Sequence, residues 1–85
     1  MYKPADLKQA IEQGLPGAIV EVQDLTGGGD HFQATVVCDQ FAGKSLLEQH
    51  QMVYKALEVV IKGDLHAIGL KTYTPDRWKK VIPLA

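Results

Sequence analysis

The sequence predicts a two-layer α/β (α+β) sandwich with the element order αββαβα and a three-stranded mixed sheet. Alternation of apolar and polar residues marks three short strands, and apolar residues at helical spacing mark two longer segments. A glycine-rich loop joins the first two strands as a β-hairpin. The long helix then connects the second strand to the third as a crossover, so we expect the helices on one face of the sheet.

The first helix is predicted over residues 4–13, because Pro4 suits the first helical turn while Gly14 and Pro16 end it. Its apolar stripe consists of Leu7, Ala10 and Ile11. Strands are predicted over 19–25 and 32–38. In the second of these, Phe32, Ala34, Val36 and Cys38 share one side, which we expect to face the core.

The long helix is predicted over residues 45–61, ended by the segment "KGD". One stripe of this helix collects Leu46, His50, Val53, Leu57 and Ile61. A third strand is predicted over 65–73. A short last helix, "TPDRWKK", follows with Thr74 as its N-cap and Pro75 as its first residue.

Composition indicates one domain over residues 1–85, and its net charge of −1 argues against strongly phosphate-driven nucleic-acid binding. The single cysteine excludes an intramolecular disulfide. The N-terminal segment has no apolar core of a signal peptide, and no apolar run reaches the length of a membrane span, which favours the cytoplasm and no membrane partner. No nucleophile and base stand in a recognisable pattern, so we expect no enzyme.

The glycines of "TGGGDHF" (residues 26–32) open a strand rather than a helix, which excludes a phosphate cradle. "GKS" at 43–45 lacks the earlier glycine of a Walker A motif, because position 38 is cysteine. His50 is expected to be a core or half-buried histidine bonded to the backbone. His66 starts a strand at the rim of the sheet, and His31 has the opposite parity to Phe32 and points away from the core. Residue by residue, structural and ligand roles stay open for His31 and His66.

Three linked motifs carry a family resemblance over roughly residues 5–80. They are F-x-G at Phe41–Gly43, Q/R-H-x-x-V at Gln49–Val53, and H-A-x-x-x-K-x-x-T-P-x-x-W from His66 to Trp78. Together they resemble the BolA family. The resemblance implies a class II KH-like fold and a CGFS monothiol glutaredoxin as partner. It also implies a [2Fe–2S] cluster shared with glutaredoxin and glutathione, with none expected in the isolated protein.

On this resemblance His66 is one iron ligand, and a second comes from the hairpin loop. In many relatives that second ligand is a cysteine or histidine four residues before the strand's aromatic residue, but Gly28 stands there in this chain. His31 is then the candidate loop ligand, while Gly28 and Gly29 let the loop approach the cofactor. A homodimer is a further partner that we consider.

The alternative function is a KH-like, nucleic-acid-binding transcriptional regulator. The basic residues that would serve it are Lys44, Lys71, Arg77, Lys79 and Lys80. A nucleic-acid-binding KH module clamps the backbone with a GxxG loop between two helices. The sequence has no GxxG between its predicted helices, which ranks this alternative second.

Overall fold

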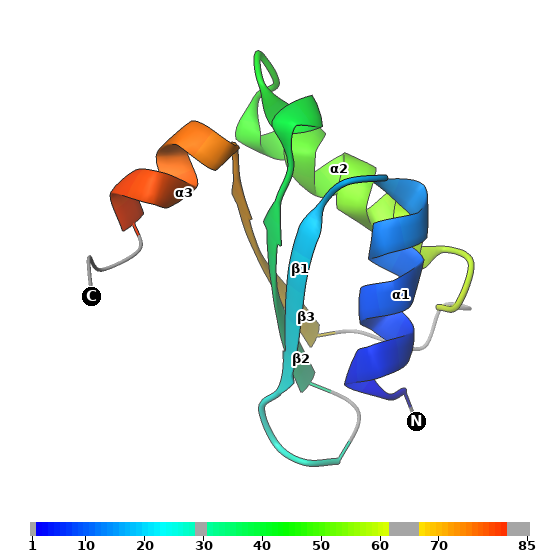
Figure 1. Cartoon of the computed structure of the whole chain (residues 1–85). Coiled ribbons are helices and arrows are strands. Elements are labelled where there is room, and N and C mark those ends of the chain that lie inside the picture. The colour runs from blue at the N-terminus through cyan, green and yellow to red at the C-terminus, as the bar shows by residue number, and fades with distance from the viewer. Residues whose placement is uncertain (1, 29–30, 62–66, 82–85) are drawn as a thin grey trace.

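The computed structural model describes residues 2–28, 31–61 and 67–81, and its elements follow the predicted order (Figure 1). They are α1 (Pro4–Gly14), β1 (Ile19–Asp24), β2 (His31–Val37), the 3₁₀ turn η1 (Asp39–Phe41), α2 (Leu46–Leu57), β3 (Ala67–Tyr73) and α3 (Pro75–Val81). None of the described helices is long and apolar enough to cross a membrane.

The described strands form one sheet in the order β1-β2-β3. β1 and β2 are antiparallel, with Val22 opposite Ala34, and β2 and β3 are parallel, with Ala34 opposite Leu70. This mixed sheet confirms the predicted α+β class. The expectation that the helices share one face is correct for α1 and α2 but wrong for α3, which follows the far end of β3 and lies on the other side of the sheet (Figure 1).

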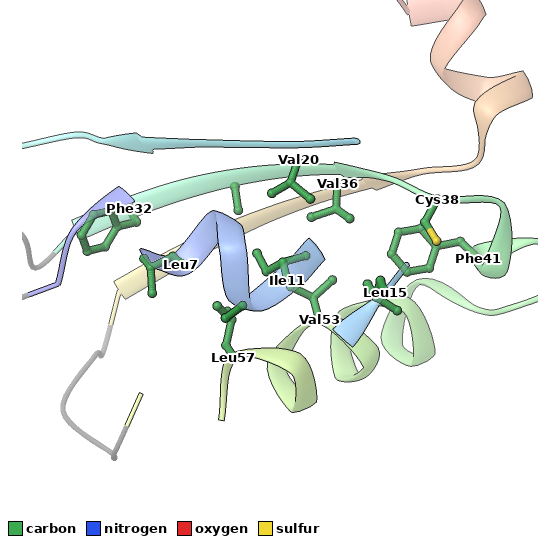
Figure 2. Packing of buried hydrophobic residues seen from close by; sticks show 12 residues of the cluster. Leu7, Ile11, Leu15, Val20, Phe32, Val36, Cys38, Phe41, Val53 and Leu57 are labelled. Carbon is green, nitrogen blue, oxygen red and sulfur yellow. The ribbon is translucent and has the colours of Figure 1, made fainter. Parts of the chain in front are cut away.

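The core lies between the sheet and the two long helices (Figure 2). Phe32, Ala34, Val36 and Cys38 are all buried, so the predicted core face of the second strand is confirmed. The Cys38 side chain is only 1% exposed and lies within the apolar cluster, as expected for a small buried hydrophobe. Opposite them the helices contribute Leu7, Ile11, Val53 and Leu57.

Two tight turns set the directions of the elements that follow them. Pro16 and Gly17 are the central residues of a turn closed by the bond from the Ala18 N–H to the Leu15 carbonyl (3.0 Å). Gly17 has φ +87°, and Gly43 has φ +76° in the matching turn from Phe41 to Lys44. A type II turn requires this positive φ at its third residue, which explains both glycines, including that of the F-x-G motif.

The long helix is shorter than predicted and less completely buried along its stripe. It ends at Leu57 rather than at residue 61, and the N–H groups of Val60 and Ile61 turn back to the Leu57 carbonyl. Leu46, which we expected on the buried stripe, is 61% exposed because it is the first helical residue. In α3, by contrast, the predicted cap is confirmed, since the Thr74 hydroxyl accepts the Arg77 N–H.

Candidate functional site at the hairpin end of the sheet

β2, which begins with the candidate ligand His31, and β3 begin at the same end of the sheet. His31 is the first residue of β2 and is the register partner of Ala67, the first described residue of β3. Neighbouring strands lie about 4.8 Å apart, so the backbone of Ala67 lies directly beside that of His31. His66 precedes Ala67 in the chain and lies outside the described residues. The structure therefore brings His31 next to the chain neighbour of His66.

His31 is exposed, whereas the next residue, Phe32, is 1% exposed and belongs to the core. Because successive side chains of a strand point to opposite faces, the imidazole of His31 points away from the core, as predicted. The His31 carbonyl accepts the Leu25 N–H at 2.8 Å, which closes the hairpin loop. The backbone of His31 is thereby held in place while its side chain stays accessible.

The described part of the hairpin loop is shaped by hydrogen bonds from its own short polar side chains. The Asp24 carboxylate accepts the N–H groups of Thr26 (3.2 Å) and Gly27 (2.9 Å). The Thr26 hydroxyl accepts the Gly28 N–H (3.2 Å). Gly28 is exposed, and Gly29 lies outside the described residues. Sequence reasoning missed Asp24 and Thr26, although aspartate and threonine before glycines are typical of side-chain-closed turns.

Gln49 ties three elements together at the opposite end of the sheet. Its amide nitrogen donates to the carbonyls of Phe41 (3.4 Å) and Lys44 (3.0 Å). Its amide oxygen accepts the hydroxyl of Thr72 at 2.6 Å, and Thr72 is buried on the core side of β3. The polar pair fixes β3 against α2, which gives Gln49 and Thr72 a structural role. The role of Thr72 was not predicted.

His50 departs from the expectation that it bonds to the backbone. Its ring is half-buried, and its buried Nε2 atom has no hydrogen-bond partner among the residues that the structure describes. An unpaired buried nitrogen loses its hydration and gains nothing in exchange. His50 lies on α2, whereas His31 begins β2.

Four of the five predicted basic residues stand on β3 and α3, and the fifth stands before α2. Arg77, Lys79 and Lys80 are exposed on α3, and Lys71 is exposed on β3, whose last residue leads into that helix. Lys44 stands before α2. Because α3 follows the end of β3 opposite to the hairpin, its basic residues lie away from His31 (Figure 1). The two candidate functions thus involve different ends of the molecule.

Within the described residues, no three histidine, cysteine or acidic side chains are grouped closely enough to hold a metal ion. Cys38 is separated from the hairpin end by the length of β2 and is enclosed in the core. Of the histidine and cysteine side chains that the structure describes, only His31 lies at the hairpin end.

Residues 11–77 match the sequence model of the BolA family, described as "BolA-like protein". The chain is 42% identical to Protein BOLA2 of Arabidopsis thaliana over 78 residues, which covers 85% of this chain and 83% of that protein. It is 36% identical over 84 residues to the DNA-binding transcriptional regulator BolA of Escherichia coli, covering 86% of this chain and 80% of the other.

The fold agrees with these sequence relationships. A solved structure of a BolA protein homologue from Coxiella burnetii superposes with a TM-score of 0.79 and 41% sequence identity. The match covers 93% of this chain and 99% of the Coxiella chain. Fold and sequence therefore indicate the same relatives over almost the whole chain.

Proposed function

This chain belongs to the BolA family, and on that premise we propose that it is a non-catalytic cytoplasmic partner of a CGFS monothiol glutaredoxin. The pair shares a [2Fe–2S] cluster and acts in iron–sulfur cluster trafficking or in iron and redox regulation. One observation carries the proposal. The exposed His31 is the register partner of Ala67, the residue that follows the motif histidine His66.

The donor chemistry at the hairpin end fits such a cluster. Imidazole replaces thiolate on one iron in Rieske centres, and it raises the reduction potential there. His66 and His31 would hold the cluster from this chain, and the glutaredoxin cysteine and glutathione would hold it from the other side. The cluster supplies one-electron chemistry and transferable iron and sulfide when it is bound. Cys38 is excluded as a ligand because its thiol is buried in the core.

The loop residues would shape the approach of the cofactor. Gly27 has φ +77° with open space around it, and Gly28 carries no side chain to obstruct a bulky group. The backbone N–H groups that donate to the side chains of Asp24 and Thr26 hold the described backbone in a closed turn. The loop thus offers room, and His31 at its exit offers the ligand that Gly28 cannot supply.

The test mixes the protein with a CGFS glutaredoxin, glutathione, iron and sulfide, and records visible circular dichroism. His66→Ala is expected to abolish the heterodimer spectrum, and His31→Ala to weaken or shift it. His50→Gln is the matched control, because it removes a histidine on a different element. An unchanged spectrum with His66→Ala would contradict the proposal. Gly28→Cys in the His31→Ala protein should restore the spectrum, since it returns a ligand to the usual loop position.

The second candidate function is DNA binding, favoured by the name of the Escherichia coli relative and by the exposed cations of α3. It ranks second because the net charge is −1 and the sequence lacks a GxxG loop between helices. A gel-shift titration over a salt series separates the two candidates. Tight, sequence-selective binding at physiological salt that Lys79→Glu removes would reverse this order.

A further inference from the structure

The strand β1 lies at an edge of the sheet and has an outer side that pairs with no other described strand. The Leu25 N–H bonds to the His31 carbonyl, so odd-numbered residues of this segment direct their backbone groups toward β2. In an antiparallel pair these directions alternate along the strand. The N–H and C=O groups of Val22 therefore point outward, away from β2, as a template for another strand. Those of Val20 point the same way, but Val20 is only 3% exposed and its edge is mostly covered.

A hollow of about 230 Å³ runs beside this outer side. Its lining consists of Lys8 from α1 and of Val20, Glu21, Val22 and Gln23 from β1. Val20 and Val22 face the core side of the sheet, and Glu21 and Gln23 face the other side. Side chains from both faces can line one hollow only along the edge of the strand. The space thus lies where an added strand would lie.

Exposed apolar side chains stand at both ends of the same segment. Ile19 is 60% exposed and Leu25 is 59% exposed. Each of them lies three positions from Val22 along the chain. A second copy paired antiparallel about Val22 therefore places Ile19 of one copy opposite Leu25 of the other, twice by symmetry. Two copies of this segment can therefore place their exposed apolar side chains against each other.

Charge selects this register over the neighbouring one. With Val22 on the two-fold axis, Glu21 faces Gln23 of the second copy, and Asp24 of the second copy comes opposite Val20, beside Lys8. With Glu21 on the axis, two carboxylates face each other, which is destabilising. If the second strand slipped by one residue, its valines would lie opposite residues of the other face of the sheet.

We propose that the outer edge of β1 is a docking surface for a second copy of this chain, paired antiparallel with Val22 opposite Val22. The two sheets then continue into one sheet through an isologous contact. The contact uses β1 and Lys8, so it stands independently of the glutaredoxin proposal.

Disulfide trapping tests the register directly. Val22→Cys is expected to give a disulfide-linked dimer under mild oxidation, because the two thiols meet on the symmetry axis. Glu21→Cys is the matched control, since it would be linked only in the competing register. The native Cys38 is buried and does not interfere. Equal rates of linkage for the two variants, or faster linkage of Glu21→Cys, would overturn the proposal.

Sedimentation equilibrium over a hundredfold range of concentration tests the contact without a cross-link. The average mass of the unmodified protein is expected to rise toward that of a dimer. Lys8→Glu should weaken self-association by about tenfold, because it places an acid beside Asp24 of the second copy. Lys55→Glu makes the same charge change on α2 and should leave it unchanged. A monomer throughout the range, or equal effects of the two variants, contradicts the proposal.

Discussion

At the scale of single residues, His50 shows that a buried polar side chain on the apolar side of a helix can lower the stability of the fold. Val53 and Leu57 on the same helix are 0% and 1% exposed, and the Nε2 atom of His50 is buried with no partner in the described part of the chain. Burying an unpaired polar group costs free energy, and no described hydrogen bond repays it here. Stability alone therefore does not explain a histidine at position 50.

We expect His50→Leu to raise the free energy of unfolding by about 1 kcal/mol, because it removes the unpaired nitrogen and keeps an apolar side chain. Urea denaturation with matched m-values measures the change. Gln51→Leu is the control, since Gln51 is exposed on the same helix and its replacement should change stability by less than about 0.5 kcal/mol. A clear loss of stability with His50→Leu would show that the imidazole has a stabilising partner.

Residue-level prediction from the sequence depended on parity. Alternation correctly placed Phe32 and Cys38 in the core and turned His31 away from it. The pairing of His31 with Ala67 could not be predicted, because it depends on the register between two strands far apart in sequence. The missing bond of His50 likewise depends on what other elements bring to it, and no local pattern reports that.

At the scale of elements, a reciprocal cap fixes the start of α2. The Ser45 hydroxyl accepts the Glu48 N–H at 3.2 Å, and the Glu48 carboxylate accepts the Ser45 N–H at 2.9 Å. The pKa of Glu48 is lowered below its ordinary value of 4.5. The main cause is the hydrogen bond from the Ser45 N–H to the Glu48 carboxylate, and the second cause is hydrogen bonding by the Ser45 side chain. Glu48 is thus favoured in its charged form in the folded protein.

This lowered pKa predicts a stability term that acts above pH 4.5 and is lost as the pH falls through the folded-state value of Glu48. Glu48→Gln keeps an acceptor for the Ser45 N–H but cannot titrate, so its stability should decline less steeply in acid. Thermal unfolding between pH 7 and pH 3 measures the difference. Glu58→Gln removes a carboxylate at the other end of α2 and is the control. Parallel acid limbs for the unmodified protein and Glu48→Gln would contradict the prediction.

The end of α2 was harder to predict than its start. Val59, Val60 and Ile61 continue the apolar spacing, so periodicity gives no stop signal before "KGD". The helix nevertheless ends at Leu57, and three β-branched residues in succession are weak helix formers. The capping residues therefore predicted the start of α2 better than periodicity predicted its end.

At the scale of the whole molecule, the packing of α1 on α2 closes the core over the sheet. The two helices come close together at Gly14, the last residue of α1. A Cβ atom added there would lie 2.5 Å from the Cβ of Ala56 and 3.1 Å from its Cα. Neither atom belongs to a flexible side chain that could move aside. The helix pair therefore requires glycine at position 14 for its present spacing.

Gly14→Ala is expected to destabilise the protein despite the better helix propensity of alanine. Overpacking costs about 1–3 kcal/mol, whereas replacing a helical glycine with alanine gains at most about 1 kcal/mol. Ala56→Gly removes the opposing Cβ, so the double variant should be more stable than the sum of the two single losses predicts, with a coupling of at least about 1 kcal/mol. Chemical denaturation of all four proteins gives this coupling. Strict additivity would mean that α1 and α2 separate freely at positions 14 and 56, and it would contradict the prediction.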